Sequence, residues 1–429
     1  MCLYISVKEI LKLKILIVNA FDIAGGAARA AYRLHRALVD TDVNSEMLVI
    51  GKFSDDYTVT PYEQNFGRIQ NRLRNLQKRV FKPLKPYPNK SETLFSPAFL
   101  SFSKVVETIN AINPDIVHLH WICQEMIRIE DLAAIEAPIV WSLHDMWAFT
   151  GGCHYDEECG QYKASCGQCK VLASIDENDL SKQVFERKLK TYAKLKSLTI
   201  VGLSHWLADC AAKSTLFKNN KIVVLPNPID IDQFKPIDKT VARTILSLPQ
   251  NKKLVLFGAM SATSDPRKGF LHLLEAINQL ETDNIELVVF GSSKPKVEQK
   301  LKYPVHYLGQ LQDNISLQLV YSACDVMVAP SLQENLSNTI MECLSCATPV
   351  VAFAIGGNGD LVTHKKNGYL AIPFDDLDLV NGIEWLLNYA DYEGLCSSSQ
   401  NKVIECFASS MVAQQYIELY KSICDCAQR

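Results

Sequence analysis

The fold is decided by the stretch KILIVNAFDIAGG at residues 14–26. Its first six residues form a short apolar run rich in β-branched side chains, which predicts a strand. Apolar residues then recur at Ala30, Leu34 and Leu38, the spacing of one face of a helix. The order is therefore strand, glycine turn and helix. Gly25 and Gly26 have no Cβ atom, so a ligand can approach the backbone there, although an ordinary turn of this kind also uses glycines.

The same alternation continues along the chain and then restarts. Short apolar runs separated by segments long enough for crossover helices predict parallel strands. The runs are 45–51, 116–120, 138–143 and 198–203 in the first half, and 253–258, 286–291, 305–308, 325–329 and 349–353 in the second. We therefore expect an α/β protein with two Rossmann-like, doubly wound domains.

A proline-rich stretch separates the two halves. Pro226, Pro228 and Pro236 punctuate it, and proline can continue neither a helix nor a central strand. Near the C-terminus, apolar residues recur at helical spacing from Phe407 to Tyr420, so a helix there needs a surface to pack on. We expect an N-terminal extension at 1–13, a first domain at 14–220, a second domain at 221–405, and a C-terminal helix at 406–429 that packs back on the first domain.

Composition and net charge exclude some classes of function. The chain has 429 residues, of which 48% are apolar and 21% charged, as in ordinary globular proteins. Lysine and arginine number 44 against 47 acidic residues, a net charge of −3, so no global positive field favours nucleic acid. No apolar run of about 18 residues predicts a membrane span, and the first residues lack the pattern of a secretory signal. We expect a cytoplasmic protein with reduced thiols and no nucleic-acid partner.

The strongest chemical signal is ENLSNTIME at residues 334–342, which follows a predicted strand and runs into a predicted helix. Ser337 or Asn338 is a suitable N-cap, which leaves Glu334 in the loop and Glu342 in the first turns of the helix. The N–H groups at such a helix start suit a phosphate, and the flanking carboxylates suit sugar hydroxyls. A capping glutamate together with a solvated one is the alternative interpretation.

Together with other motifs, this stretch resembles the donor-binding half of the retaining glycosyltransferases of family four, which have the two-domain GT-B fold. The matching segments follow one another from about residue 14 to the C-terminus. They are FDIAGG at 21–26, DIVHLH at 115–120, SLHD at 142–145, SHWL at 204–207, PNPID at 226–230, DPRKGF at 265–270, TPVVA at 348–352, GG at 356–357 and NGYL at 367–370. The resemblance implies two domains that face a central cleft, in an enzyme of the bacterial polysaccharide or glycolipid type.

The resemblance also implies a reaction. A hexose would pass, with retention of configuration, from a nucleotide-diphosphate sugar to a hydroxyl of a glycan or lipid-linked acceptor. No catalytic metal or protein nucleophile is implied, so the protein would position groups and stabilise charge. His144, Glu334 and Lys268 are the implied catalytic residues. The implied donor-binding residues are Gly25, Gly26, Gly258, Arg267, Lys268, Glu334, Asn335, Leu336, Ser337, Asn338 and Glu342, and those on the acceptor side are Asp22 and His120.

The sequence departs from the family pattern at one important position. Family members commonly have an arginine directly after the glycine that ends the strand, whereas Gly258 is followed by Ala259 and Met260. Arg267 is the nearest substitute for the second cation on the diphosphate. Two alternatives stay open: a nucleotide-sugar epimerase of similar architecture, which acts without an acceptor, and a catalytically silent sugar-binding protein that keeps the fold.

A basic stretch lies between Glu63 and Glu92. It contains eight basic residues and no acidic residue, with apolar side chains between them. A solvated helix face is one interpretation, and contact with the anionic inner face of the cell membrane is the other. The basic residues are Arg68, Arg72, Arg74, Lys78, Arg79, Lys82, Lys85 and Lys90.

Four cysteines follow the predicted active-site histidine. They are Cys153, Cys159, Cys166 and Cys169, and their segment lacks the apolar periodicity that would bury them all as core residues. Metal binding, disulfides and free thiols are the alternatives. The spacing predicts a tetrathiolate site for a structural zinc, with His154 as a substitute ligand, which would brace the loop without activating water.

Overall fold

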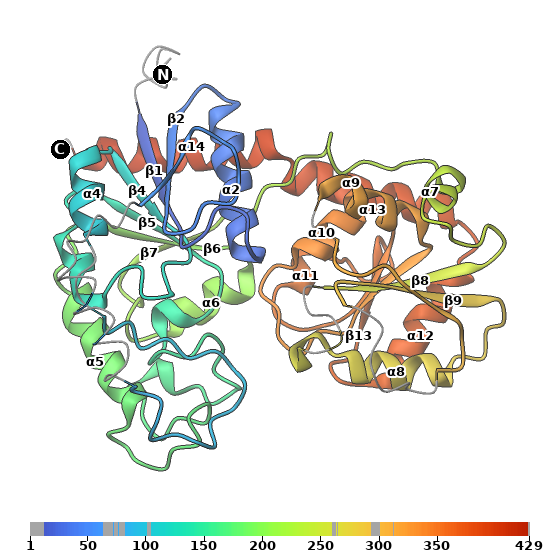
Figure 1. Ribbon diagram of the computed structural model, residues 1–429, viewed down its shortest axis with the longest axis horizontal. Helices are drawn as coiled ribbons and strands as arrows, with labels where there is room; N and C mark the ends of the chain where they lie inside the picture. The colour runs from blue at the N-terminus through green and yellow to red at the C-terminus, as the bar shows by residue number, and fades with distance from the viewer. Residues whose placement is uncertain are drawn as a thin grey trace. The chain divides into compact units, whose positions relative to one another are not determined.

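The computed structural model describes residues 13–62, 72, 76, 82–100, 104–259, 263, 265–292, 301–311 and 313–427. The chain forms two compact units, of which the first comprises Met1–Asn227 and Ala413–Arg429 and the second Pro228–Val412 (Figure 1). Each boundary lies about seven residues after the one expected from the sequence. The C-terminal segment therefore belongs to the first unit.

The first unit is built on a parallel sheet that has, in the described residues, the order β3-β2-β1-β4-β5-β6-β7. From β1 the chain moves outward through β2 and β3, and then places β4 on the other side of β1. The carboxyl ends of β1 and β4 therefore form a topological switch point, where open sheets bind ligands. The strands are β1 (Lys14–Val18), β2 (Asn44–Val49), β3 (Val59–Pro61), β4 (Ile116–Leu119), β5 (Ile139–Leu143), β6 (Leu198–Gly202) and β7 (Lys221–Val224).

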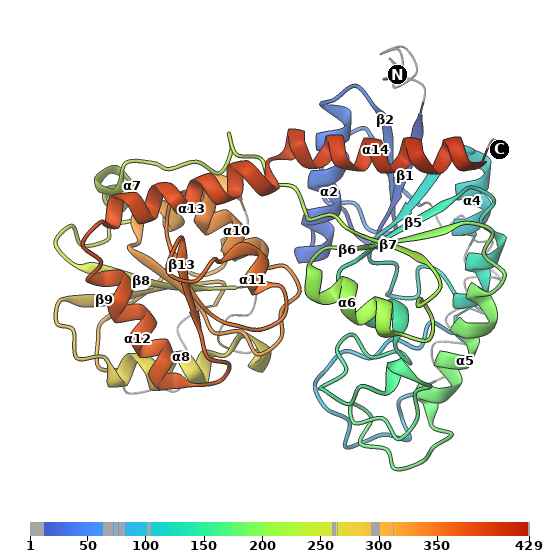
Figure 2. The same cartoon turned by 180° about the vertical axis from the view of Figure 1, so that it is seen from behind.

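The last helix of the chain packs on the sheet of the first unit. Figure 2 shows α14 (Ser409–Ala427) crossing this sheet in front of β1 and β5. Tyr416 and Tyr420 of α14 are 1% and 0% exposed, so their rings are part of the core. In the described residues, the other helices of this unit are α2 (Gly26–Val39), α4 (Val105–Ile112), α5 (Leu180–Tyr192) and α6 (His205–Lys213), with 3-10 helices at Ile129–Ala134 (η1), Trp147–Phe149 (η2) and Gln161–Lys163 (η3).

The second unit repeats the same plan. In the described residues its parallel sheet has the order β10-β9-β8-β11-β12-β13, with the switch point between β8 and β11. Two doubly wound sheets confirm the predicted fold class. The strands are β8 (Lys253–Gly258), β9 (Ile285–Phe290), β10 (Val305–Tyr307), β11 (Val326–Ala329), β12 (Val350–Phe353) and β13 (Gly368–Ala371), and the helices are α7 (Lys239–Ile245), η4 (Pro266–Lys268), α8 (Phe270–Gln279), α9 (Asn314–Ala323), α10 (Asn338–Ser345), α11 (Asn358–Leu361), α12 (Asp376–Leu387) and α13 (Tyr392–Phe407).

The C-terminal helical region differs from the single predicted helix. α13 ends at Phe407 and α14 begins at Ser409, because Ala408 between them adopts φ −56° and ψ 136°, outside the helical region. The N–H of Ile229 donates to the carbonyl of Phe407 at 2.9 Å, which anchors this break to the second unit. Within the described part of the chain, no helix has both the length and the hydropathy that crossing a membrane requires.

Candidate functional site

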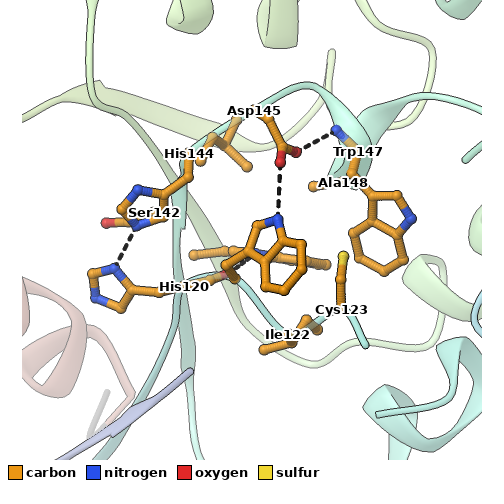
Figure 3. Close-up of a pocket in the computed structure, with 11 residues that line it drawn as sticks. His120, Ile122, Cys123, Ser142, His144, Asp145, Trp147 and Ala148 are labelled. Carbon is orange, nitrogen blue, oxygen red and sulfur yellow. Dashed lines mark hydrogen bonds between the residues drawn. The ribbon is translucent and has the colours of Figure 1, made fainter. Parts of the chain in front are cut away.

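The first site lies in the first unit, at the carboxyl ends of β4 and β5. His120 directly follows β4 and His144 directly follows β5. Nδ1 of His120 lies 2.9 Å from Nε2 of His144, so the two imidazoles share one hydrogen bond. Figure 3 shows this pair on one side of a pocket and the indole of Trp147 on the other. The pocket is lined by His120, Trp121, Ile122, Cys123, Trp141, Ser142, Leu143, His144, Asp145, Trp147 and Ala148.

Burial keeps the imidazoles of this site uncharged near neutral pH. It lowers the pKa of His144 to about 4 and that of His118, on β4, to about 3. It also holds the pKa of His120 well below its ordinary value, with a further contribution from His118 and His144. A neutral imidazole has one donor and one acceptor nitrogen, so the pair offers polarity without a fixed positive charge.

Asp145, the next residue after His144, is held by three donors. Its carboxylate accepts hydrogen bonds from Nδ1 of His154 at 2.6 Å, from the indole N–H of Trp121 at 3.0 Å, and from the N–H of Trp147 at 2.8 Å. Burial acts to raise the pKa of Asp145, but His154 and the other donors outweigh it and lower that pKa. Nε2 of His154 in turn lies 2.8 Å from the hydroxyl of Ser96. His154 therefore fixes Asp145, a role that the sequence patterns do not predict.

Lys188 is a second residue that the sequence patterns do not predict. It lies on α5, is 0% exposed, and donates to the carbonyl of Trp147 and, at 3.1 Å, to that of Thr150. Its Nζ also lies 3.9 Å from the centre of the Trp147 ring, a cation–π distance. Burial lowers the pKa of Lys188 to about 7. The amine thus holds the turn that follows His144 and Asp145.

Asp22 and Gly25 shape the loop between β1 and α2. The buried Asp22 carboxylate accepts hydrogen bonds from the N–H groups of Ile23, Phe53 and Ser54 at 2.8 to 3.0 Å. It therefore joins the loop after β1 to the loop after β2, and its place on the acceptor side stays a prediction. Gly25 has a φ of 101°, in the left-handed region that favours glycine, and α2 begins at the next residue.

The second site lies in the second unit, where η4 meets the loop before α10. Nζ of Lys268 lies 2.9 Å from an oxygen of Glu334, and the two side chains are 25% and 15% exposed. The N–H of Leu332 donates to the carbonyl of Arg267 at 2.7 Å, which ties the two segments together. The structure thus brings two predicted catalytic residues into one ion pair.

Two glycines allow the close backbone packing around this ion pair. Gly269, directly after Lys268, has a φ of 70°, and a Cβ there would lie 1.8 Å from the carbonyl oxygen of Pro330. Gly356 has a φ of 50°, and a Cβ there would lie 1.8 Å from the carbonyl oxygen of Glu334. The N–H of Gly357 donates to that same oxygen at 3.3 Å. Larger residues at 269 or 356 would displace the backbone that carries the pair.

The helix after Glu334 begins as the sequence predicts. Ser337 is the N-cap of α10, and its hydroxyl accepts from the N–H of Ile340 at 3.4 Å. Glu342 is 2% exposed, and its carboxylate accepts a hydrogen bond from the hydroxyl of Tyr321 at 2.8 Å. The Glu342 carboxylate is therefore more deeply buried than its predicted role at a ligand suggests, and Tyr321 on α9 orients it. Asn335 and Leu336, between the two glutamates, are buried as well.

Two further predicted donor residues have intramolecular partners. The Arg267 guanidinium pairs with the carboxylate of Asp265 at 2.7 Å, and Asp265 is the N-cap of η4. Burial acts to raise the pKa of Asp265, and Arg267 and Lys268 lower it below its ordinary value. A Cβ at Gly258 would lie 1.9 Å from the ring of Phe290, so packing between β8 and β9 already requires glycine there.

The four predicted zinc ligands lie between β5 and α5. Cys153, Cys166 and Cys169 are buried and Cys159 is half-buried. Among the described residues, which include all four, no group of three or more histidine, cysteine or acidic side chains is arranged to hold a metal ion. The structural zinc stays a prediction.

The basic stretch falls largely outside the described residues. Of its eight basic residues, Arg68, Arg74, Lys78 and Arg79 lie in the part that the structure does not describe, whereas Arg72, Lys82, Lys85 and Lys90 are exposed. Membrane contact through this stretch stays a prediction.

Comparison with known proteins identifies relatives for both units. The family model "Glycosyltransferase Family 4" matches residues 24–233, and "Glycosyl transferases group 1" matches residues 251–389. An uncharacterised glycosyltransferase of Methanocaldococcus jannaschii is 22% identical over 345 residues, covering 73% of this chain and 86% of that protein. A glycosyl transferase of Escherichia coli K12, assigned provisionally by its name to colanic acid biosynthesis, is 21% identical and covers 76% of this chain and 81% of its own length.

Solved structures share the fold of the whole chain. The sucrose-phosphate synthase of Thermosynechococcus elongatus has a TM-score of 0.65 at 19% identity, covering 96% of this chain and 99% of its own. The Anabaena protein HepE, solved with UDP and glucose, has a TM-score of 0.64 at 18% identity and covers 96% of this chain and all of its own. With both units matched by glycosyltransferase models and both sheets wound as in these GT-B structures, the chain belongs to the family-four type of glycosyltransferases.

Proposed function

We propose that the protein is a retaining glycosyltransferase that moves a hexose from a nucleotide-diphosphate sugar to a hydroxyl of a glycan or lipid-linked acceptor in cell-surface polysaccharide synthesis. The family membership supports the transfer of a sugar. HepE has been solved with UDP-glucose, which supports a nucleotide-sugar donor and makes UDP-glucose the first donor to test. The E. coli relative supports a role in polysaccharide synthesis. We place the enzyme at the cytoplasmic face of the cell membrane, where lipid-linked acceptors would be available.

The Lys268–Glu334 ion pair is the observation that carries this proposal. Both side chains are partly exposed, so a ligand can reach them. A donor diphosphate would pair with the Lys268 ammonium, which would then stabilise the negative charge of the leaving group as the glycosidic bond breaks. The Glu334 carboxylate, freed from Lys268, would accept hydrogen bonds from hydroxyls of the donor sugar. Without a donor, Lys268 and Glu334 therefore neutralise each other's charge. A bound donor diphosphate would take the place of Glu334 beside Lys268.

Glu342 and His144 complete the proposed set. Tyr321 holds the Glu342 carboxylate through one hydrogen bond, in an orientation that we propose serves the ribose hydroxyls. His144, uncharged because of its burial, would hydrogen-bond the reacting sugar. None of these groups forms a covalent intermediate in the proposed reaction, so positioning and charge stabilisation supply the catalysis.

A donor screen tests the proposal. The full chain is incubated with a panel of nucleotide-diphosphate sugars that begins with UDP-glucose, with and without candidate glycan acceptors, and nucleotide release is measured. We expect release that depends on one donor and is stimulated by an acceptor. Conversion of the donor to another nucleotide sugar without an acceptor would identify an epimerase, and the absence of turnover and of donor binding across the panel would support a silent protein.

A further inference from the structure

An exposed aromatic side chain lies in the loop that follows β2 in the first unit. The residue is Phe53, whose side chain is 64% exposed. In the sheet, β2 lies next to β1, and β1 lies next to β4, so this loop borders the switch point of the sheet. Open sheets bind ligands at the carboxyl ends of their strands, beside the switch point. Phe53 therefore lies at an edge where a ligand can reach its ring.

The protein holds this exposed ring in place. The buried Asp22 carboxylate accepts hydrogen bonds from the N–H of Phe53 at 2.9 Å and from that of Ser54 at 2.8 Å. The Phe53 ring packs edge to face on the ring of Phe21, at 6.0 Å between centroids. Phe21 lies against Gly51, where a Cβ would lie 2.8 Å from its ring. A side chain that is ordered in advance loses little conformational entropy when a ligand covers it.

The charges of the same loop disfavour an anionic ligand. Residues 50–58 contain one basic residue, Lys52, and two acidic residues, Asp55 and Asp56. The Lys52 ammonium donates to the carbonyl of Asp56 at 2.6 Å, and the Asp56 carboxylate pairs with Arg36 at 3.2 Å. The loop itself therefore offers no excess positive charge to a phosphate or to an anionic lipid surface. An uncharged ligand with an apolar face fits this loop better.

A sugar ring has this chemistry. One face of a pyranose presents C–H groups, which can lie on an aromatic ring, while the hydroxyls at its rim stay in contact with water. A carboxylate such as that of the exposed Asp55 can accept hydrogen bonds from those hydroxyls. The chain belongs to a family that transfers sugars, so a glycan is the first uncharged ligand to consider at Phe53.

The sheet order indicates how far this sugar lies from the proposed reaction centre. The strands β2, β1, β4 and β5 are consecutive neighbours, and His144 directly follows β5. Neighbouring strands lie about 4.8 Å apart, so three spacings separate β2 from β5 by about 14 Å. A single sugar ring is shorter than this distance. A glycan that reaches both places must therefore contain more than one sugar unit.

We propose that Phe53 forms an accessory subsite for a sugar ring of the acceptor, remote from the reacting hydroxyl, and that the acceptor carries an oligosaccharide rather than a single sugar. The inference rests on the proposed function for the place of the reacting hydroxyl near His144. Phe53 is then a specificity-determining residue, because it favours longer acceptors over shorter ones.

Acceptor fragments of increasing length test the subsite in the full chain. With the donor found in the screen, kcat/KM is measured for monosaccharide, disaccharide and trisaccharide fragments that end in the same accepting sugar. We expect kcat/KM of the wild type to rise with length. Phe53→Ala should lower it about 5- to 10-fold for the trisaccharide, through KM, and leave the monosaccharide unchanged.

Two further variants separate the aromatic ring from other effects of substitution. Phe53→Trp keeps an aromatic ring and should retain the preference for the trisaccharide. Tyr57→Ala, at a residue of the same loop that is 90% exposed, is the matched control and should behave as the wild type. Equal losses for all three acceptor lengths, no loss for the trisaccharide, or the same loss in Tyr57→Ala would overturn the proposal.

Failure of this inference is distinguishable from failure of the proposed function. Normal transfer by the wild type with an unchanged Phe53→Ala variant rejects only the subsite. If the wild type transfers no sugar, saturation-transfer NMR decides the matter with maltotriose, cellotriose and mannotriose as probes. The ring C–H protons of at least one trisaccharide should receive saturation from the wild type and less from Phe53→Ala. Equal saturation from both proteins, or none from the wild type, would overturn the proposal.

Discussion

Single side chains decide how the second unit would hold a charged donor. Lys268 is the cation that faces the loop before α10, because Arg267 next to it is paired with Asp265. Gly269 leaves room for the carbonyl of Pro330, and Gly356 leaves room for the carbonyl of Glu334. In the proposed donor site, the departure from the family pattern after Gly258 would leave more of the diphosphate charge to Lys268.

Lys268→Ala should weaken donor binding and turnover while leaving the fold intact. Loss of a hydrogen bond to a charged group is worth about 1.5 to 3 kcal/mol, on the order of 10- to 100-fold in affinity. Calorimetric titration with the donor found in the screen measures the loss, and Lys235→Ala, an exposed lysine of the same unit, is the matched control. Donor affinity equal to that of the wild type would remove Lys268 from the site.

Lys188 is an example of a site residue that could not be predicted from the sequence. A lysine in an amphipathic helix is ordinarily solvated, so its burial against the carbonyls of Trp147 and Thr150 follows only from tertiary packing. The same holds for Tyr321, whose hydroxyl reaches Glu342 from a different helix. His144, Lys268 and Glu334 could be predicted as candidates because their motifs are local in sequence. Lys188 and Tyr321 could not be predicted, because each reaches the site from a distant segment.

The buried amine of Lys188 should make stability depend on pH. Its pKa is about 7 in the folded protein, against an ordinary value of 10.5, so between these values the unfolded chain binds more protons. The free energy of unfolding should therefore rise with pH from about 7 toward 10.5. Urea denaturation across this range should show a smaller rise for Lys188→Met than for the wild type. Lys190→Met, at an exposed position of the same helix, should follow the wild type, and parallel curves for all three proteins would contradict the assignment.

Among the secondary-structure elements, periodicity predicts the central strands and one edge strand, β10, but misses the other three edge strands of the described sheets. The segment at 14–26 and the restart at 253 predict β1 and β8, from which each sheet extends. β3 at Val59–Pro61 escapes the pattern because it is short and ends in a proline, which is tolerated at the edge of a sheet. β7 and β13 are the other outer strands that the patterns do not predict, and each has only four residues.

Metal analysis tests whether the four cysteines between β5 and α5 bind zinc. If four thiolates bind zinc, protein purified without chelator should contain about one zinc per chain. Cys166→Ser and Cys169→Ser should abolish it and lower activity through disorder of the loop that carries His154. Cys426→Ser, at an exposed cysteine near the C-terminus, is the control. Four freely titrating thiols in a metal-free protein would exclude the zinc site and would leave the transferase assignment unaffected.

At the scale of the whole molecule, the C-terminal segment completes the first unit. α14 buries Tyr416 and Tyr420 against the sheet, and their hydroxyls contact Ser142 and His118 on two neighbouring strands. A segment more than 200 residues away in sequence thus covers the strands whose ends carry His120 and His144. The first unit therefore depends on the end of the chain for its core.

Tyr420→Phe should lower the stability of the first unit. It removes the hydroxyl partner of Nδ1 of His118 in a fully buried place, at a cost of about 1 to 3 kcal/mol. Thermal unfolding followed by circular dichroism measures the effect. Tyr57→Phe, at a residue 90% exposed, is the matched control and should leave unfolding unchanged. Equal stability of the two variants would show that the Tyr420–His118 contact contributes little.

The anomeric configuration of the product is the sharpest test of retaining sugar transfer by this protein. A retaining transferase makes a bond with the configuration of the donor, and the family membership together with the proposed roles of Lys268 and Glu334 predicts this outcome. Proton NMR of freshly formed product, from the donor and acceptor identified in the screen, reads the configuration from the coupling of the anomeric proton. A retaining enzyme gives an α-linked product from an α-linked donor, whereas a β-linked product would show inversion and rule out the proposed reaction.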